Sequence, residues 1–94
     1  MAGYRLMYSE TSRNQILKLH PEIKSIVRKR LELLNKEPFK GKRLERELAG
    51  LRSLRVKRFR IVYKIDDTAK IIEIHYIGHR RDVYELFAER SGRL

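Results

Sequence analysis

Five side chains in the second half of the sequence could act together on a phosphate group. Arg55, Lys57 and Arg60 lie close together along the chain, and Arg80 precedes Tyr84 by four residues. An arginine fork binds two phosphate oxygens at once and can stabilise the charge that develops during attack on a phosphodiester. A tyrosine beside cations is favoured as the phenolate, which can accept a proton, although its ring could equally stack on a base. These residue types predict a site for phosphodiester chemistry.

The sequence lacks the groups that phosphodiester chemistry often uses besides arginine and tyrosine. It has no cysteine, no Asp, Glu or His cluster at metal-ligand spacing, and no P-loop or dinucleotide-binding fingerprint. We therefore expect no metal and no small-molecule cofactor. In RNA the 2′-hydroxyl is an internal nucleophile, so a protein need only remove its proton, stabilise the phosphorane and protonate the leaving 5′-oxygen.

Any one of these cations could simply face solvent, but the whole chain is basic as well. The 94 residues carry 23 Lys and Arg against 12 Asp and Glu, a formal net charge of +11. Solubility alone needs a net charge of only about 2–8 in a small domain, so we expect a polyanionic partner, either nucleic acid or an acidic protein. With no apolar run of about 18 residues, we expect one soluble, cytoplasmic domain over residues 1–94 that binds no membrane.

The first half of the chain has the pattern of a strand followed by two helices. Residues 4–8 form a strand candidate, and the hydroxyls of residues 9–12 suit a helix N-cap. Apolar residues then recur at steps of three and four, interrupted by Pro21, which favours the first turn of a new helix. The sequence predicts helices at about 12–19 and 21–36, then an irregular connector over residues 39–51 with one helical turn at 44–48.

The second half changes to the two-residue period of strands. We expect strands at 54–57, 59–65 and 70–77, with a loop at residues 66–69. That loop would place Ile65 opposite Lys70, Tyr63 opposite Ile72 and Ile61 opposite Ile74. One face is then apolar apart from Lys70 at its loop end: Leu54, Val56, Phe59, Ile61, Tyr63, Ile65, Ile72, Ile74 and Tyr76. The other face holds Arg55, Lys57, Arg60, Val62, Lys64, Ile71, Glu73, His75 and Ile77, and a one-residue slip would bury its charges.

These elements predict an α+β fold in two layers. The N-terminal strand and the helical hairpin pack on the apolar face of a twisted antiparallel sheet of about four strands. The opposite, cationic face stays uncovered. Asp82 and Glu85 suit a capping box, so a short C-terminal helix is expected at about residues 83–90. Tyr84 would lie in its first turn, close to Arg80 and Arg81.

Segments spread over nearly the whole chain resemble the RelE/ParE superfamily of toxins from bacterial and archaeal toxin–antitoxin pairs. The likeness begins with the Tyr/Leu strand and its Ser-led helix. It continues in three motifs: Leu51-Arg52-Ser53-Leu54-Arg55-Val56, Phe59-Arg60-Ile61-Val62-Tyr63 and Ile77-Gly78-His79-Arg80-Arg81-Asp82-Val83-Tyr84. The last two are the more specific.

The resemblance implies a RelE-like fold and a chemistry for the basic face. RelE-type members cut mRNA in the ribosomal A site through the 2′-hydroxyl, without metal. The implied catalytic residues are Arg60 and Arg80, which stabilise the phosphate, and Tyr84, which activates the 2′-hydroxyl or stacks on the base. The implied RNA-binding residues are Arg55 and Lys57, which precede the central arginine, and we expect Lys64, His79 and Arg81 to bind RNA as well. Arg80 and Tyr84 are separated by a shorter segment than in some RelE-type toxins.

The resemblance leaves the target of the toxin open between alternatives. ParE-type relatives share the fold but inhibit DNA gyrase and need no RNA-cleaving residues, and a nucleic-acid-binding module without toxicity is a third possibility. For the toxins, the implied partner is a cognate acidic, RelB-like antitoxin that lies in grooves beside the sheet and covers or displaces residues 83–94. The ribonuclease interpretation adds the ribosome and mRNA as partners.

Overall fold

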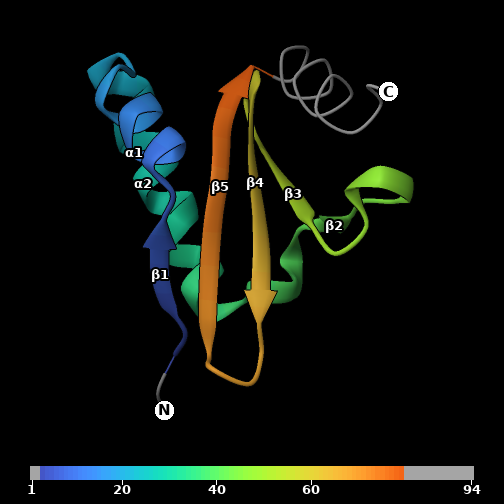
Figure 1. The fold of residues 1–94 in the computed structure, drawn as a ribbon. Helices are drawn as coiled ribbons and strands as arrows, with labels where there is room; N and C mark the ends of the chain where they lie inside the picture. The colour runs from blue at the N-terminus through green and yellow to red at the C-terminus, as the bar shows by residue number, and fades with distance from the viewer. Residues whose placement is uncertain (1–2, 80–94) are drawn as a thin grey trace.

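Two helices on one side of a five-stranded sheet account for residues 3–79, the part of the chain that the computed structural model describes (Figure 1). The elements are β1 (Arg5–Tyr8), α1 (Glu10–Leu17), α2 (Pro21–Lys36), β2 (Lys42–Arg43), β3 (Arg52–Val56), β4 (Phe59–Asp66) and β5 (Ile71–His79), with 3₁₀ turns at Pro38–Lys40 and Arg46–Leu48. The predicted α+β class is confirmed. The helix expected at residues 83–90 lies outside the described residues.

Capping residues determine where each helix of the hairpin begins. Ser9 is the N-cap of α1, and its hydroxyl accepts a hydrogen bond from the amide of Ser12 at 3.0 Å. α1 therefore starts about two residues earlier than predicted. Pro21 stands in the first turn of α2, and the Nδ1 atom of His20 accepts a hydrogen bond from the amide of Glu22 at 3.1 Å. Local cap chemistry thus defines both helix starts.

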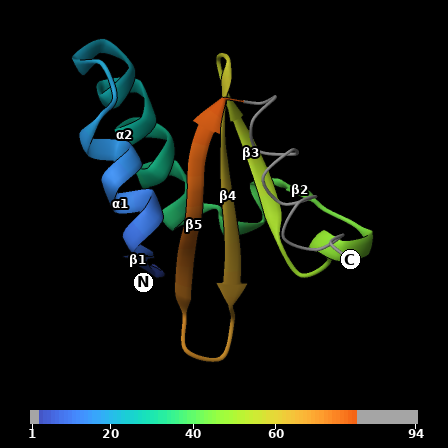
Figure 2. The same cartoon turned by 45° about the horizontal axis from the view of Figure 1, so that its top comes forward.

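The sheet has the strand order β1-β5-β4-β3-β2, with the helices on one face (Figure 2). β1 pairs in parallel with β5, whereas the other neighbours are antiparallel. The sheet is therefore mixed and has more strands than predicted. Parallel partners need a long crossover connection, and here the two partners come from opposite ends of the described chain. Periodicity predicts every strand except β2, which lies in the segment predicted to be an irregular connector, and it contains no signal for such a distant pairing.

Where β1 ends, side chains of α1 take over as hydrogen-bond partners for the edge of β5. The hydroxyl of Ser12, which is fully buried, donates a hydrogen bond to the carbonyl of Ile74 at 2.9 Å. The side-chain oxygen of Gln15 accepts one from the amide of Ile77 at 2.7 Å. Backbone groups of β5 that no longer face a strand are satisfied by the helix instead.

The predicted register of the β4–β5 hairpin is wrong by two residues at its loop end. Ile65 lies opposite Ile72 and Tyr63 opposite Ile74, because the strands extend to Asp66 and Ile71 and the loop starts one residue later than predicted. A shift of two keeps each side chain on its predicted face.

A β-bulge then changes the faces in the second half of β5. The register shifts between Val62 and Tyr63, so His75 is left as the extra residue of the longer strand. Beyond it, Ile77 lies opposite Ile61 in the core, and Tyr76 lies opposite Val62 on the other face. The sequence prediction had these two residues the other way round.

The apolar side chains form two clusters, one on each face of the sheet. The larger lies under the helices and contains Val27, Leu31, Leu34, Leu54, Val56, Ile61, Tyr63, Ile72, Ile74 and Ile77. The smaller consists of Val62 and Tyr76, covered by Leu44, Leu48 and Leu51 from the connector. The face predicted to be uncovered is therefore partly covered, because Val62 and Tyr76 are too apolar to remain in water.

Tyr63 fixes the start of that connector. Its hydroxyl donates to the carbonyl of Pro38 at 2.8 Å and accepts from the amide of Gly41 at 2.9 Å. A Cβ atom at Gly41 would lie only 2.3 Å from this hydroxyl, so the contact requires glycine.

Among residues 3–79, no helix is long and apolar enough to cross a membrane.

Candidate nucleic-acid interface

Arg60 lies near the start of β4, the middle strand, on the sheet face opposite the helices. It lies on β4 between Arg55 on β3 and Gly78 on β5, its two cross-strand partners. Its Nη1 atom donates a hydrogen bond of 2.7 Å to the hydroxyl of Ser53, a residue only 3% exposed. Arg60 is half-buried, and this hydrogen bond to a buried neighbour orients its guanidinium. Orientation of this kind is what stabilisation of a developing charge requires.

The bulge brings Tyr76 onto this same face, and Gly78 makes space for its ring. A Cβ atom at position 78 would lie 2.8 Å from the Cε2 atom of Tyr76. The ring thus lies over the glycine that faces Arg60. Sequence reasoning missed Tyr76 as part of this surface, and only the extra residue in β5 reveals it.

Two further predicted cations lie at the β3–β4 end of the face. Arg55 is exposed, and its Nε atom donates to the carbonyl of Lys57 at 3.5 Å. Lys57 stands in the turn itself with φ of 57°, a conformation that non-glycine residues rarely adopt. Neither residue forms an ion pair with another described residue. The structure therefore pairs Arg55 with Arg60 on one face, as strand alternation predicts, whereas Lys57 lies in the turn that follows β3 and not on the predicted strand.

Lys64 and His79 are placed differently from this group. Lys64 is exposed on the same face, but it is paired across the strands with Glu73, toward the opposite end of β4. His79 pairs with Phe59, and the two rings stack with centroids 4.6 Å apart. Alternation along β5 puts His79 on the face opposite Gly78. Arg80, Arg81 and Tyr84 lie outside the described residues.

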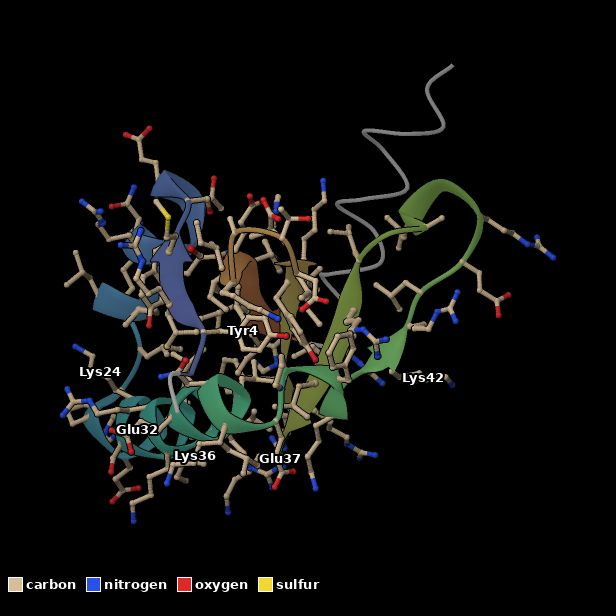
Figure 3. All side chains as sticks on the ribbon, turned by 90° about the horizontal axis from the view of Figure 1, so that it is seen from below. Tyr4, Lys24, Glu32, Lys36, Glu37 and Lys42 are labelled. Atoms are coloured by element: carbon tan, nitrogen blue, oxygen red, sulfur yellow. The ribbon has the colours of Figure 1, made fainter. Side chains whose placement is uncertain are left out.

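The clearest pKa shifts occur away from this face, in a surface cluster that joins β1 to the β4–β5 loop. The hydroxyl of Tyr4 donates a hydrogen bond to Asp67, and the ammonium of Lys70 lies 3.1 Å from the same carboxylate (Figure 3 labels Tyr4). The hydrogen bond from Tyr4, followed by that from Lys70, lowers the pKa of Asp67. The bond to Asp67 likewise raises the pKa of both Tyr4 and Lys70. We interpret this cluster as structural, because all its charges are already paired.

The fold and this face together define a small basic domain with arginines on one face of its sheet. Within residues 3–79, no three acidic or histidine side chains form a group that could hold a metal ion. Residues 4–84 match the family model described as the ParE toxin of the type II toxin–antitoxin system parDE. The chain is also 37% identical over 83 residues to Toxin RelG of Mycobacterium tuberculosis, covering 86% of this chain and 95% of that toxin. It therefore belongs to the RelE/ParE superfamily of type II toxins.

Solved structures of toxins share the fold. The toxin–antitoxin complex RelBE2 from Mycobacterium tuberculosis contains a chain with a TM-score of 0.77 and 36% identity, covering 83% of this chain and 99% of that one. A mutant of the E. coli toxin RelE in the free state has a TM-score of 0.75 at 19% identity, covering 96% and 98%. The intact E. coli RelBE complex gives 0.72 at 18% identity, covering 81% and 95%. The last two similarities concern the fold alone.

Proposed function

We propose that this chain is an endoribonuclease that cleaves mRNA in the ribosomal A site and so inhibits translation. The observation that carries the proposal is the geometry of Arg60, which Ser53 fixes beside Arg55 on a basic sheet face. Attack by the RNA 2′-hydroxyl on the neighbouring phosphate needs no metal or other cofactor, since the nucleophile is part of the substrate. Residues 1–94 would form one domain that acts in the cytoplasm.

Arg60 would bind the scissile phosphate and stabilise the added negative charge of the phosphorane. Because its guanidinium is already oriented, little reorganisation is needed when that charge develops. Arg80 follows β5 directly in sequence, two residues after the glycine that faces Arg60, and supplies the second arginine. Tyr84 takes the 2′-hydroxyl proton or stacks on the base.

The remaining basic residues would hold the RNA backbone rather than the reacting atoms. Arg55 and Lys57 extend the positive surface from Arg60 toward the β3–β4 turn, and Lys64 extends it in the other direction. Of the other two predicted RNA-binding residues, His79 lies on the opposite face of the sheet, stacked on Phe59, and Arg81 follows β5 in sequence. Backbone contacts of this kind supply affinity that falls steeply with salt, since bound counterions are released from the RNA.

The partner that would keep the toxin inactive is a cognate acidic antitoxin. The relatives RelBE2 and E. coli RelBE are toxin–antitoxin complexes. The net charge of +11 on this chain favours an acidic partner through electrostatic complementarity.

Mapping mRNA 5′ ends on purified translating ribosomes tests the proposed reaction. We expect Arg60→Ala to reduce the cleavage rate by roughly 10²–10³-fold, the usual effect of losing one preorganised donor. Arg60→Lys should be nearly as slow, because an ammonium keeps the charge but loses the fork. Arg5→Ala, an exposed arginine on β1, is the matched control and should cleave at the parent rate. Equal cleavage by all four proteins would contradict the proposal.

Inhibition of DNA gyrase is the second candidate, favoured by the description of the matching family as the ParE toxin. Persistent gyrase–DNA cleavage complexes with intact mRNA, after brief expression of the chain, would support this function instead. The same two measurements would also identify a chain without toxicity, which would produce neither effect.

A further inference from the structure

A cavity of about 250 Å³ lies at the edge of the sheet, where the connector that follows α2 meets β3 and the β4–β5 loop. Phe39, in the 3₁₀ turn Pro38–Lys40, lines this cavity and is 55% exposed. Single exposed apolar residues are common, so the significance of Phe39 depends on its neighbours. The aliphatic part of the lining includes Leu44, Leu51 and Ile65.

Arg52 supports the ring of Phe39 from one side. The carbon of its guanidinium lies 5.0 Å from the ring centroid. Its Nη1 atom donates a hydrogen bond to the carbonyl of Gly41 at 2.8 Å and a weaker one to the carbonyl of Phe39 at 3.3 Å. These bonds hold the guanidinium against the turn that carries the ring. Because a cation covers only one side of a ring and Phe39 is more than half exposed, the ring remains accessible to a second planar group.

A second arginine lines the same cavity without a counter-charge. Arg43 lies directly opposite Arg52 in the pairing of β2 with β3, so the two guanidinium groups share one face. Within residues 3–79, neither of them forms an ion pair. Like charges directly opposite each other destabilise a strand pair, and an anion bound between them would relieve the repulsion. Lys42, labelled in Figure 3, is exposed beside Arg43.

We propose that this cavity is a binding subsite for one unpaired base of single-stranded RNA and the phosphate attached to it. The base stacks on Phe39, and Arg43 contacts the phosphate in the positive field that Arg52 reinforces. Aromatic rings and arginines are the groups with which proteins hold single strands regardless of sequence. The inference rests on the proposed function in one respect, namely that RNA is the ligand.

The subsite is separate from the site around Arg60. Arg52 pairs with Tyr63, which is three residues along β4 from Arg60, a distance of about 10 Å. Alternation along β3 puts Arg52 on the same face as Leu54, under the helices, whereas Arg60 lies on the opposite face. A strand bound at both places would pass around the β2 edge of the sheet. The base held by Phe39 therefore belongs to a different nucleotide from the one that Arg60 contacts.

The size and charge of the cavity favour a single base over other ligands. Its volume is below the roughly 300–1,000 Å³ of typical small-molecule sites. Asp67 also lines the cavity, but its carboxylate already binds the hydroxyl of Tyr4 and the ammonium of Lys70, so the charges left open are positive. An acidic protein segment would pair with the same cations but would not require an aromatic ring at position 39. The test measures that difference.

Phe39→Leu and Phe39→Tyr form a matched pair for this test, since both keep an apolar side chain but only tyrosine keeps a ring. Fluorescence anisotropy measures binding of a labelled 2′-O-methyl RNA oligomer of about ten unpaired nucleotides, whose blocked 2′-oxygens prevent cleavage. We expect Phe39→Leu to weaken binding roughly 5- to 150-fold, the loss of one stacked base, and Phe39→Tyr to bind like the parent. Leu17→Ala, at another exposed apolar residue, should also bind like the parent. Arg43→Ala should lower the slope of log Kd against log salt by about 0.7, as for one phosphate contact on a single strand.

Binding that requires a ring at position 39 supports the subsite. Equal binding by the parent and Phe39→Leu overturns it, and so does a parent that does not bind the oligomer. Weakened antitoxin binding in Phe39→Leu with unchanged RNA binding also overturns it and assigns the cavity to a protein partner.

Two measurements on ribosomes identify the source of the base and separate this inference from the proposed function. Ultraviolet cross-linking of the parent and of Phe39→Leu shows whether the cross-link that is lost is to mRNA or to ribosomal RNA, and loss of neither overturns the subsite. Should the parent fail to cleave mRNA yet bind the oligomer through Phe39, the enzymatic proposal fails and the subsite stands.

Discussion

Ser53→Ala tests whether the orientation of Arg60 matters. The substitution removes one oxygen, and with it the acceptor that lies 2.7 Å from Nη1 of Arg60. A hydrogen bond to a charged group contributes about 1.5–3 kcal/mol, and Ser53 is buried, so no water can readily replace it. If half of that energy holds Arg60 in its reactive orientation, about 0.8–1.5 kcal/mol, the cleavage rate falls roughly four- to twelvefold.

Two measurements distinguish this effect from general unfolding. Single-turnover cleavage on ribosomes should slow in Ser53→Ala, while Ser53→Thr, which keeps the hydroxyl on a strand-forming residue, should recover most of the rate. The guanidinium NMR signals of Arg60 should broaden in the alanine variant and stay sharp in the threonine variant. An alanine variant that cleaves at the parent rate with unchanged Arg60 signals would refute the role assigned to Ser53.

Three further changes probe the stability of the domain, each followed by urea or thermal unfolding. Gly78→Val should destabilise the protein by about 1–3 kcal/mol, because the new side chain meets the ring of Tyr76 at 2.8 Å and the ring must shift. Tyr63→Phe should cost about 1–3 kcal/mol by leaving the amide of Gly41 without its acceptor in the interior. The pKa of Asp67 is lowered below its ordinary 3.8 in the folded state. The stability that this shift contributes is thus fully present above that value and is lost as pH falls through the folded pKa. Asp67→Asn should therefore flatten the acid dependence of the unfolding free energy, whereas alanine substitutions at other exposed sites should leave it unchanged.

The sequence is most informative where the cause of a structure is local. The helix starts at Ser9 and Pro21 follow from cap chemistry, and the face that carries Arg55 and Arg60 follows from strand alternation. Parallel pairing of β1 with β5 depends on contacts between distant segments, and no local pattern encodes it. The catalytic roles of the residues beyond His79 stay predictions from the family resemblance.

The extra residue at His75 shows why the composition of the face could not be read from periodicity. One residue inserted in a strand exchanges the faces of everything after it, so Tyr76 joins Arg60 and Ile77 enters the core. The backbone at the extra residue is bound by the other layer of the molecule. The hydroxyl of Ser9 donates to the carbonyl of His75 at 3.1 Å, beside the bonds that α1 makes to the flanking residues of β5.

The helical layer and the basic face are therefore structurally coupled. α1 supplies hydrogen bonds to the backbone of β5 on both sides of the bulge. The bulge in turn places the ring of Tyr76 over Gly78, the cross-strand partner of Arg60.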